Sequence, residues 1–146
     1  MTGDNFPVTI FHNPECGTSR NVLAIIEAAG YRPTVVEYLV AGWTRPQLLA
    51  LFAAAGLSAR QALRETKSPA AELGLLADGV PEGQLIDAMI KHPILVNRPI
   101  VATPKGVKLC RPSELVLDLL DRWPAGPFSK EDGSLLIDAD GKRVAG

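Results

Sequence analysis

A strand, a helix and a second strand follow one another at the start of the chain, and this order constrains the fold most. Residues 8–11 form a short β-prone run that ends at the turn signal Asn13-Pro14. Apolar residues then recur at helical spacing over residues 19–29, and Gly30 follows as a helix-ending residue. Residues 34–38 form the next β-prone run. Such a unit predicts two parallel strands joined by a right-handed crossover.

The last third of the chain returns to strand patterns. Residues 100–103 and 107–110 flank the turn Pro104-Lys105-Gly106, which predicts a β-hairpin, and Pro112 opens a helix that runs to Leu120. The chain therefore has the order β-α-β and then β-β-α, which is the order of the thioredoxin/glutaredoxin core. We predict an α/β protein with a thioredoxin/glutaredoxin-like fold and a helical insertion over about residues 44–97.

The insertion carries its own helix signals. Thr44 with Gln47, and Ser58 with Gln61, have the spacing of a capping box, in which each side chain bonds the other's backbone N–H. Residues 81–91 place apolar side chains on one helical face, which predicts an amphipathic helix.

Length and composition indicate one globular domain. The 146 residues, 47% hydrophobic and 21% charged, are enough for a single core. Within this domain, 1–146, we expect residues 1–7 to be flexible and residues 124–146 to form a C-terminal extension. Asp-Gly turns at 132–133 and 140–141 predict that the extension forms a small hairpin or lies over the core.

Composition also excludes several classes of protein. A formal net charge of −1 argues against a nucleic-acid-binding protein, which usually has a basic excess. Neither a signal segment nor an apolar run long enough to span a bilayer is present. Two cysteines are too few for a disulfide scaffold, so we expect a reduced, cytoplasmic setting.

Cys16 lies between the first strand and the first helix, in Cys16-Gly17-Thr18-Ser19. Free backbone N–H groups and the helix dipole favour a negative charge at this position, so a thiol here has a lowered pKa. The hydroxyl of Ser19 can hydrogen-bond the thiolate, but Ser19 cannot form a disulfide with it. The alternative is a small apolar residue buried at a strand end. The helix start favours a reactive thiol.

The two histidines and the second cysteine are less informative. His12 precedes Cys16 by four residues and either helps to ionise the thiol or is a hydrogen-bonded structural group. With His92 as the one other histidine and no close pair of carboxylates, we expect no metal site. Cys110 ends a hairpin strand, where packing in the sheet is favoured over a role as a resolving thiol.

Three arginines stand at the ends of predicted elements: Arg64, Arg98 and Arg111. Surface positions are the ordinary alternative for each of them. However, Pro99 follows Arg98 in the slot where thioredoxin-like folds keep a cis-proline facing the active cysteine. Guanidinium groups at these positions can hold a tetrahedral oxyanion through paired hydrogen bonds. The pattern predicts a Cys16 thiolate that faces a pocket for a small anion.

The sequence resembles a known family at these same positions. His12-Asn13-Pro14-Glu15-Cys16-Gly17-Thr18-Ser19-Arg20 resembles the active-site signature of the glutaredoxin-linked arsenate reductases of the bacterial arsenic-resistance type. The similarity covers about residues 8–141 and includes the segments Ala62-Leu63-Arg64, Asn97-Arg98-Pro99 and Leu109-Cys110-Arg111-Pro112.

The resemblance implies a mechanism in which Cys16 attacks arsenate and forms a thiolate–arsenate adduct. Glutathione, as a co-substrate, would attack the adduct, glutaredoxin would remove that thiol as a mixed disulfide, and arsenite would leave. The resemblance implies no bound cofactor. The site residues that it implies besides Cys16 are the oxyanion-binding Arg64, Arg98 and Arg111, and His12 and Ser19, which keep the cysteine ionised.

Several related classes of enzyme have a different pattern around the cysteine. Phosphatase-type enzymes have an arginine six positions after the cysteine, where this chain has Val22. A dithiol oxidoreductase has a second cysteine at the position of Ser19. Two alternatives with the same fold stay open, a redox regulator that binds RNA polymerase and a general glutathione-dependent thiol reductase. Loss of the three arginines would favour either of them, and all three are present.

Overall fold

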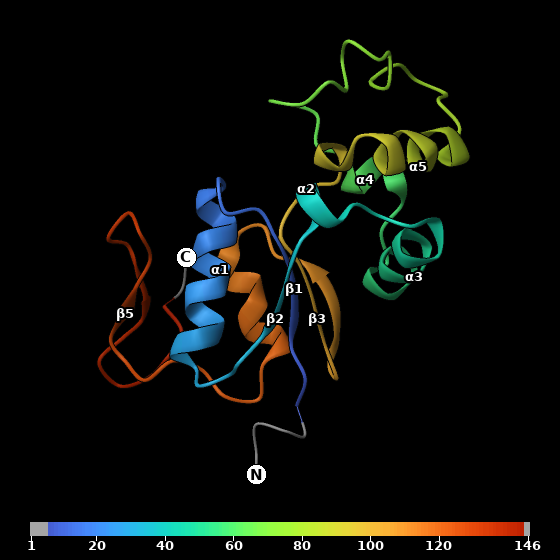
Figure 1. Ribbon diagram of the computed structural model, residues 1–146. Coiled ribbons are helices and arrows are strands. Elements are labelled where there is room, and N and C mark those ends of the chain that lie inside the picture. The colour runs from blue at the N-terminus through green and yellow to red at the C-terminus, as the bar shows by residue number, and fades with distance from the viewer. Residues whose placement is uncertain (1–5, 145–146) are drawn as a thin grey trace. The chain divides into compact units, whose positions relative to one another are not determined.

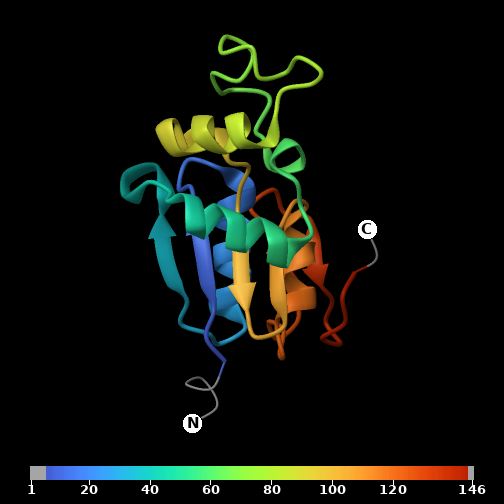
Figure 2. The same cartoon turned by 90° about the vertical axis from the view of Figure 1, so that its right-hand side faces the viewer.

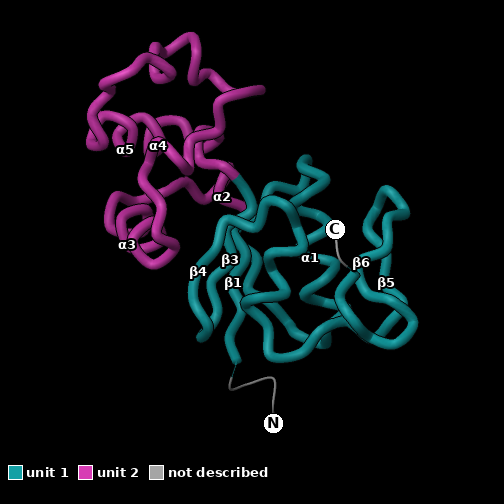
Figure 3. Tube along the Cα trace, turned by 180° about the vertical axis from the view of Figure 1, so that it is seen from behind, with its two compact units in different colours: residues 1–36, 98–146 teal, residues 37–97 magenta. Residues whose placement is uncertain are grey.

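The computed structural model describes residues 6–144 of the chain. These residues form two compact units, one made of the described residues up to Val36 and from Arg98 onward, the other of Glu37–Asn97 (Figure 3). In chain order the elements are β1 (Thr9–His12), α1 (Gly17–Ala28), β2 (Thr34–Glu37), α2 (Tyr38–Ala41), α3 (Arg45–Ala55), α4 (Ala59–Ala62), α5 (Glu82–Lys91), the 3-10 helix η2 (Pro93–Leu95), β3 (Ile100–Thr103), β4 (Gly106–Leu109), the 3-10 helix η3 (Ser113–Leu119), β5 (Phe128–Ser129) and β6 (Leu135–Ile137).

The first unit is built on a four-stranded sheet with the order β2-β1-β3-β4. Strand β3 is antiparallel to both of its neighbours, with Val101 opposite Ile10 of β1 and opposite Lys108 of β4. Strands β1 and β2 run in the same direction and are joined through α1 (Figure 2). Helices α1 and η3 lie on one face of the sheet (Figure 1). This arrangement confirms the predicted α/β fold.

The core of the first unit joins this sheet to its two helices and to the C-terminal hairpin. Ile25 and Ile26 of α1 are fully buried, and so is Val116 of η3. Leu136 and Ile137 of β6 belong to the same cluster. Because each large aliphatic side chain stabilises the fold by about 1.5–3 kcal/mol on burial, the β5–β6 hairpin is an integral part of this unit. The predicted extension is therefore a hairpin that also packs on the core.

The second unit is helical, as predicted, but it begins earlier in the chain. Both capping boxes form, at Thr44 before α3 and at Ser58 before α4. The unit also includes α2, which follows β2 directly, so it starts at Glu37. Tyr38, at the start of α2, is 1% exposed and stacks on Trp43 with ring centroids 5.1 Å apart.

One further detail differs from the sequence expectations. The helix after Pro112 is a 3-10 helix, in which Leu115 N–H donates to the Pro112 carbonyl three residues earlier. Of residues 1–7, for which we predict flexibility, residues 1–5 lie outside the described part. Phe6 packs on Tyr31 with ring centroids 5.3 Å apart. No helix within residues 6–144 is both long and apolar enough to cross a membrane.

Gly126 is the position in the C-terminal extension where a side chain has least room. A Cβ added there would overlap the carbonyl oxygen of Asp138 and lie 3.0 Å from the backbone nitrogen of Gly141. Backbone atoms cannot rotate away, so we expect Gly126→Ala to lower the free energy of unfolding by about 1–3 kcal/mol in urea titrations. Gly83→Ala is the matched control because an added Cβ there meets nothing within 4 Å. Equal stability of the two variants would contradict this account.

Candidate active site

Cys16 ends the loop after β1 and is the N-cap residue of α1, with an extended backbone at φ −102° and ψ 122°. Its backbone N–H donates to the Asn13 carbonyl at 3.0 Å, and its carbonyl accepts from the Arg20 N–H at 2.9 Å. The residue as a whole is 8% exposed. The structure thus places the thiol at the helix N-terminus, where the sequence predicts it.

The surroundings of the Cys16 thiol favour its ionised form. Burial raises the pKa of the thiol, and the backbone N–H of Ser19 and the charge of Arg98 oppose this effect. The side chain of Arg111 and the backbone N–H of Thr18 add to the opposition, and the net result is a lowered pKa. The N–H groups of the first turn therefore act on the thiolate as a local positive field.

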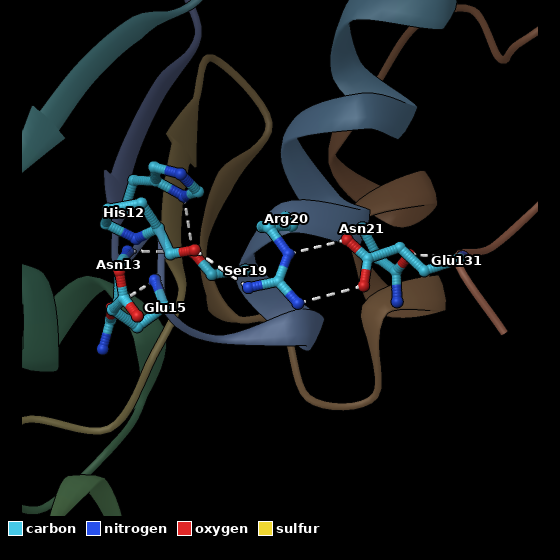
Figure 4. A network of polar contacts seen from close by, with 8 residues as sticks. His12, Asn13, Glu15, Ser19, Arg20, Asn21 and Glu131 are labelled. Carbon is cyan, nitrogen blue, oxygen red and sulfur yellow. Dashed lines mark hydrogen bonds and ion pairs between the residues drawn. The ribbon is translucent and has the colours of Figure 1, made fainter.

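His12 and Ser19 form a buried polar cluster with Asn13 (Figure 4). The Nδ1 atom of His12 lies 2.7 Å from Ser19 Oγ, and the backbone N–H of Asn13 donates to the same oxygen at 3.0 Å. The hydroxyl of Ser19 thus contacts His12 and the loop, while its backbone N–H supports the thiolate. The sequence pattern had pointed to the hydroxyl for that role.

Asn13 is a further residue of the site. The sequence predicts only that it lies in a turn. Its side-chain Oδ1 accepts from the backbone N–H of Glu15 at 2.9 Å, and its carbonyl accepts from Cys16. Both bonds shape the loop that presents the thiol. The Asn-Pro pair was the signal that could have identified this role, because asparagine side chains commonly bond the backbone two residues on. Glu15 is exposed.

Two of the three predicted arginines lie in the same unit as Cys16. A guanidinium N–H of Arg111 (Nη1) donates to Cys16 Sγ at 3.7 Å and to the Arg98 carbonyl at 3.1 Å. The Arg98–Pro99 peptide bond is cis, and the Pro99 carbonyl accepts from the Cys110 N–H at 2.9 Å. The structure therefore brings Cys16, Arg98 and Arg111 together around the thiol.

Arg64 lies in the helical unit, directly after a bridge between Leu63 and Val96. Its backbone N–H donates to the Leu95 carbonyl at 2.8 Å, and its Nε donates to the Thr66 carbonyl at 3.1 Å. The convergence of Arg64 with the other two arginines stays a prediction.

Cys110 differs from Cys16 in the direction in which its surroundings shift the pKa of the thiol. It is 0% exposed, and burial raises the pKa of its thiol to about 12. Both cysteines are free thiols. Within the described residues, no cluster of three or more histidine, cysteine, aspartate or glutamate side chains could hold a metal ion. The chemistry that the site supports is nucleophilic attack by one thiolate on an anion held by guanidinium groups.

Comparison with known proteins places this arrangement in context. The model of the ArsC family matches residues 11–119. The chain is 69% identical over 137 residues to arsenate reductase ArsI2 of Synechocystis sp., which covers 94% of this chain and 98% of that protein. It is 53% identical over 137 residues to an arsenate reductase of Escherichia coli, covering 94% and 97%. Among solved structures, arsenate reductase from Vibrio cholerae superimposes with a TM-score of 0.75 at 35% identity, over 79% of this chain and 98% of that one.

Proposed function

The chain belongs to the ArsC family, and we propose that it is an arsenate reductase that uses Cys16 as nucleophile and glutathione with glutaredoxin as the source of electrons. The observation that carries the proposal is the 3.7 Å contact between Arg111 and a thiol at a helix N-terminus. That contact supports the proposal because a cation beside the thiol can stabilise both an attacking thiolate and an oxyanion that binds next to it.

The proposed reaction starts with the Cys16 thiolate. Its sulfur attacks the arsenic(V) centre, and one arsenate oxygen leaves as water after taking up protons. Arg98 and Arg111 neutralise the arsenate oxygens, which would otherwise repel the thiolate, and the family resemblance gives Arg64 the same role.

The two electrons that convert arsenic(V) to arsenic(III) come from two external thiols. The glutathione thiol bonds to the arsenic of the adduct and displaces a second arsenate oxygen, which leaves as water, and the thiolate of glutaredoxin then attacks the glutathione sulfur. These two sulfurs leave as a mixed disulfide and the electron pair stays on arsenic. Hydrolysis of the Cys16–arsenic bond releases arsenite and restores the thiol. Ser19 occupies the position of a second active-site cysteine, which is why the reductant must come from outside the chain.

The test is arsenite formation by the full chain with arsenate and glutathione, with and without glutaredoxin. We expect turnover to require both thiols, and thioredoxin with its reductase not to replace them. Turnover with thioredoxin alone would overturn the proposed electron source. Reduction of a glutathione mixed disulfide without any arsenate reduction would instead support the general thiol reductase.

A further inference from the structure

We propose that two consecutive residues of the C-terminal hairpin, Lys130 and Glu131, form a clamp that positions Cys16 against Arg111. Lys130 and Glu131 lie in the turn between β5 and β6, and their side chains reach two different elements. Glu131 contacts α1, which follows Cys16, and Lys130 contacts η3, which follows Arg111. The inference rests on the proposed function in taking Cys16 and Arg111 as the reacting pair.

Glu131 holds the cysteine side of the site. Arg20, in the first turn of α1, donates to both carboxylate oxygens of Glu131, from Nε at 2.7 Å and from Nη2 at 3.1 Å (Figure 4). The backbone N–H of Glu131 also donates to the side chain of Asn21 at 2.9 Å. Arg20 in turn donates from Nη1 to the Pro14 carbonyl at 2.9 Å. Glu131 thus connects to both the loop before Cys16 and the helix after it.

The pair of Arg20 and Glu131 lies directly over the residue that follows the nucleophile. A Cβ added at Gly17 would be 3.6 Å from Arg20 Nη2 and 3.7 Å from Glu131 Oε1. The hairpin turn therefore reaches the first residue of α1, next to the N–H groups that stabilise the thiolate.

Lys130 holds the arginine side. Its Nζ donates to Glu114 Oε2 at 3.0 Å, and the two side chains are 18% and 22% exposed. Glu114 lies in the first turn of η3, three residues after Arg111, and Ser113 also donates to its carboxylate at 3.3 Å. The clamp therefore spans the two segments that carry Cys16 and Arg111.

These contacts are suited to fix the positions of Cys16 and Arg111 and add little to the stability of the fold. Arg20 and Glu131 are both nearly half exposed, and exposed ion pairs add little to the free energy of folding. A paired arginine–carboxylate contact nevertheless fixes direction as well as distance. Cys16 and Arg111 are separated by 95 residues in sequence, so their 3.7 Å separation depends on how the segments around them are held.

The charged and titratable groups around Cys16 come from each element of this unit that borders it: His12 of β1, Glu15 of the loop, Arg20 of α1, Arg98 before β3, Arg111 after β4, and Glu131 of the hairpin. Removing the negative charge of Glu131 acts through space to favour the thiolate. Displacing Cys16 from Arg111 acts in the opposite direction. The sign of the change in Glu131→Gln therefore separates a positional role from simple electrostatics.

The experiment measures the rate of Cys16 alkylation by iodoacetamide as a function of pH in Glu131→Gln and Lys130→Met. We expect both variants to raise the midpoint pH and to slow alkylation at pH 7 by about fivefold, as for one lost hydrogen bond. These substitutions change the net charge in opposite directions, so a shared direction indicates position. Thermal unfolding in parallel shows that each variant is folded.

Arg143→Gln is the matched control. Arg143 also ties the extension to η3, through Asp118 at 2.9 Å, but it contacts the far end of that helix. We expect its alkylation profile to match that of the unaltered protein. A lowered or unchanged midpoint in Glu131→Gln, or an equal shift in Arg143→Gln, would overturn the clamp. Because alkylation involves no arsenate, it tests the clamp even if the protein does not reduce arsenate in the proposed way.

Discussion

The Cys16→Ser variant is expected to lose arsenate reduction by about 10⁴-fold or more, as when other catalytic nucleophiles are removed. The reason is that the proposed reaction needs the ionised sulfur of Cys16 as the nucleophile. Backbone N–H groups and two arginines hold the pKa of the Cys16 thiol low despite its burial. A serine hydroxyl at the same place stays protonated and cannot form the arsenic adduct. The measurement is arsenite formed in the presence of glutathione and glutaredoxin.

Cys110→Ser is the control for this prediction and should keep most of the activity. Cys110 is fully buried, its thiol pKa is raised to about 12, and its sulfur lies 3.7 Å from the Lys108 carbonyl. A serine hydroxyl can donate to the same carbonyl, and Cys110→Ala provides a second variant without a polar group. Full activity in Cys16→Ser, or loss of activity in both folded Cys110 variants, would be incompatible with a single catalytic thiol.

The positions of Cys16 and Pro99 were predictable from the sequence. Cys16 stands between a β-prone run and a helical pattern, so its position at a helix N-terminus follows from the order of residues alone. Pro99 was predicted from the thioredoxin-like order of elements, in which a cis-proline precedes the next strand, and its peptide bond is cis.

Contacts between distant segments were not predictable from the sequence. Arg20 and Glu131 are 111 residues apart, and the turn that contains Glu131 carries signals for its own shape alone. The early start of the helical unit depends on the burial of Tyr38 against Trp43, which is also a tertiary contact. The sequence around an exposed charged residue in a turn does not predict which residue it will contact. The clamp could therefore be found only in the folded chain.

The midpoint pH of Cys16 alkylation should rise when Arg111 is replaced by Leu. In the unaltered protein the pKa of the thiol is lowered, so its alkylation rate rises at a lower pH than that of an ordinary cysteine. The substitution removes the hydrogen bond from Arg111, while burial continues to raise the pKa. The thiolate fraction at neutral pH must then fall. For arsenate reduction we expect kcat/KM to fall about 10²- to 10³-fold, as when one oxyanion-binding donor is lost.

Arg111→Lys separates the charge of this residue from its geometry. A lysine keeps a positive charge near the sulfur but lacks the planar fork that can bond an oxyanion at two points. We expect its alkylation midpoint to stay closer to that of the unaltered protein than the midpoint of Arg111→Leu. Protection of Cys16 from alkylation by phosphate should nevertheless be weakened in both variants. If phosphate protects Arg111→Leu as well as it protects the unaltered protein, then Arg111 does not bind the anion and acts on the thiol alone.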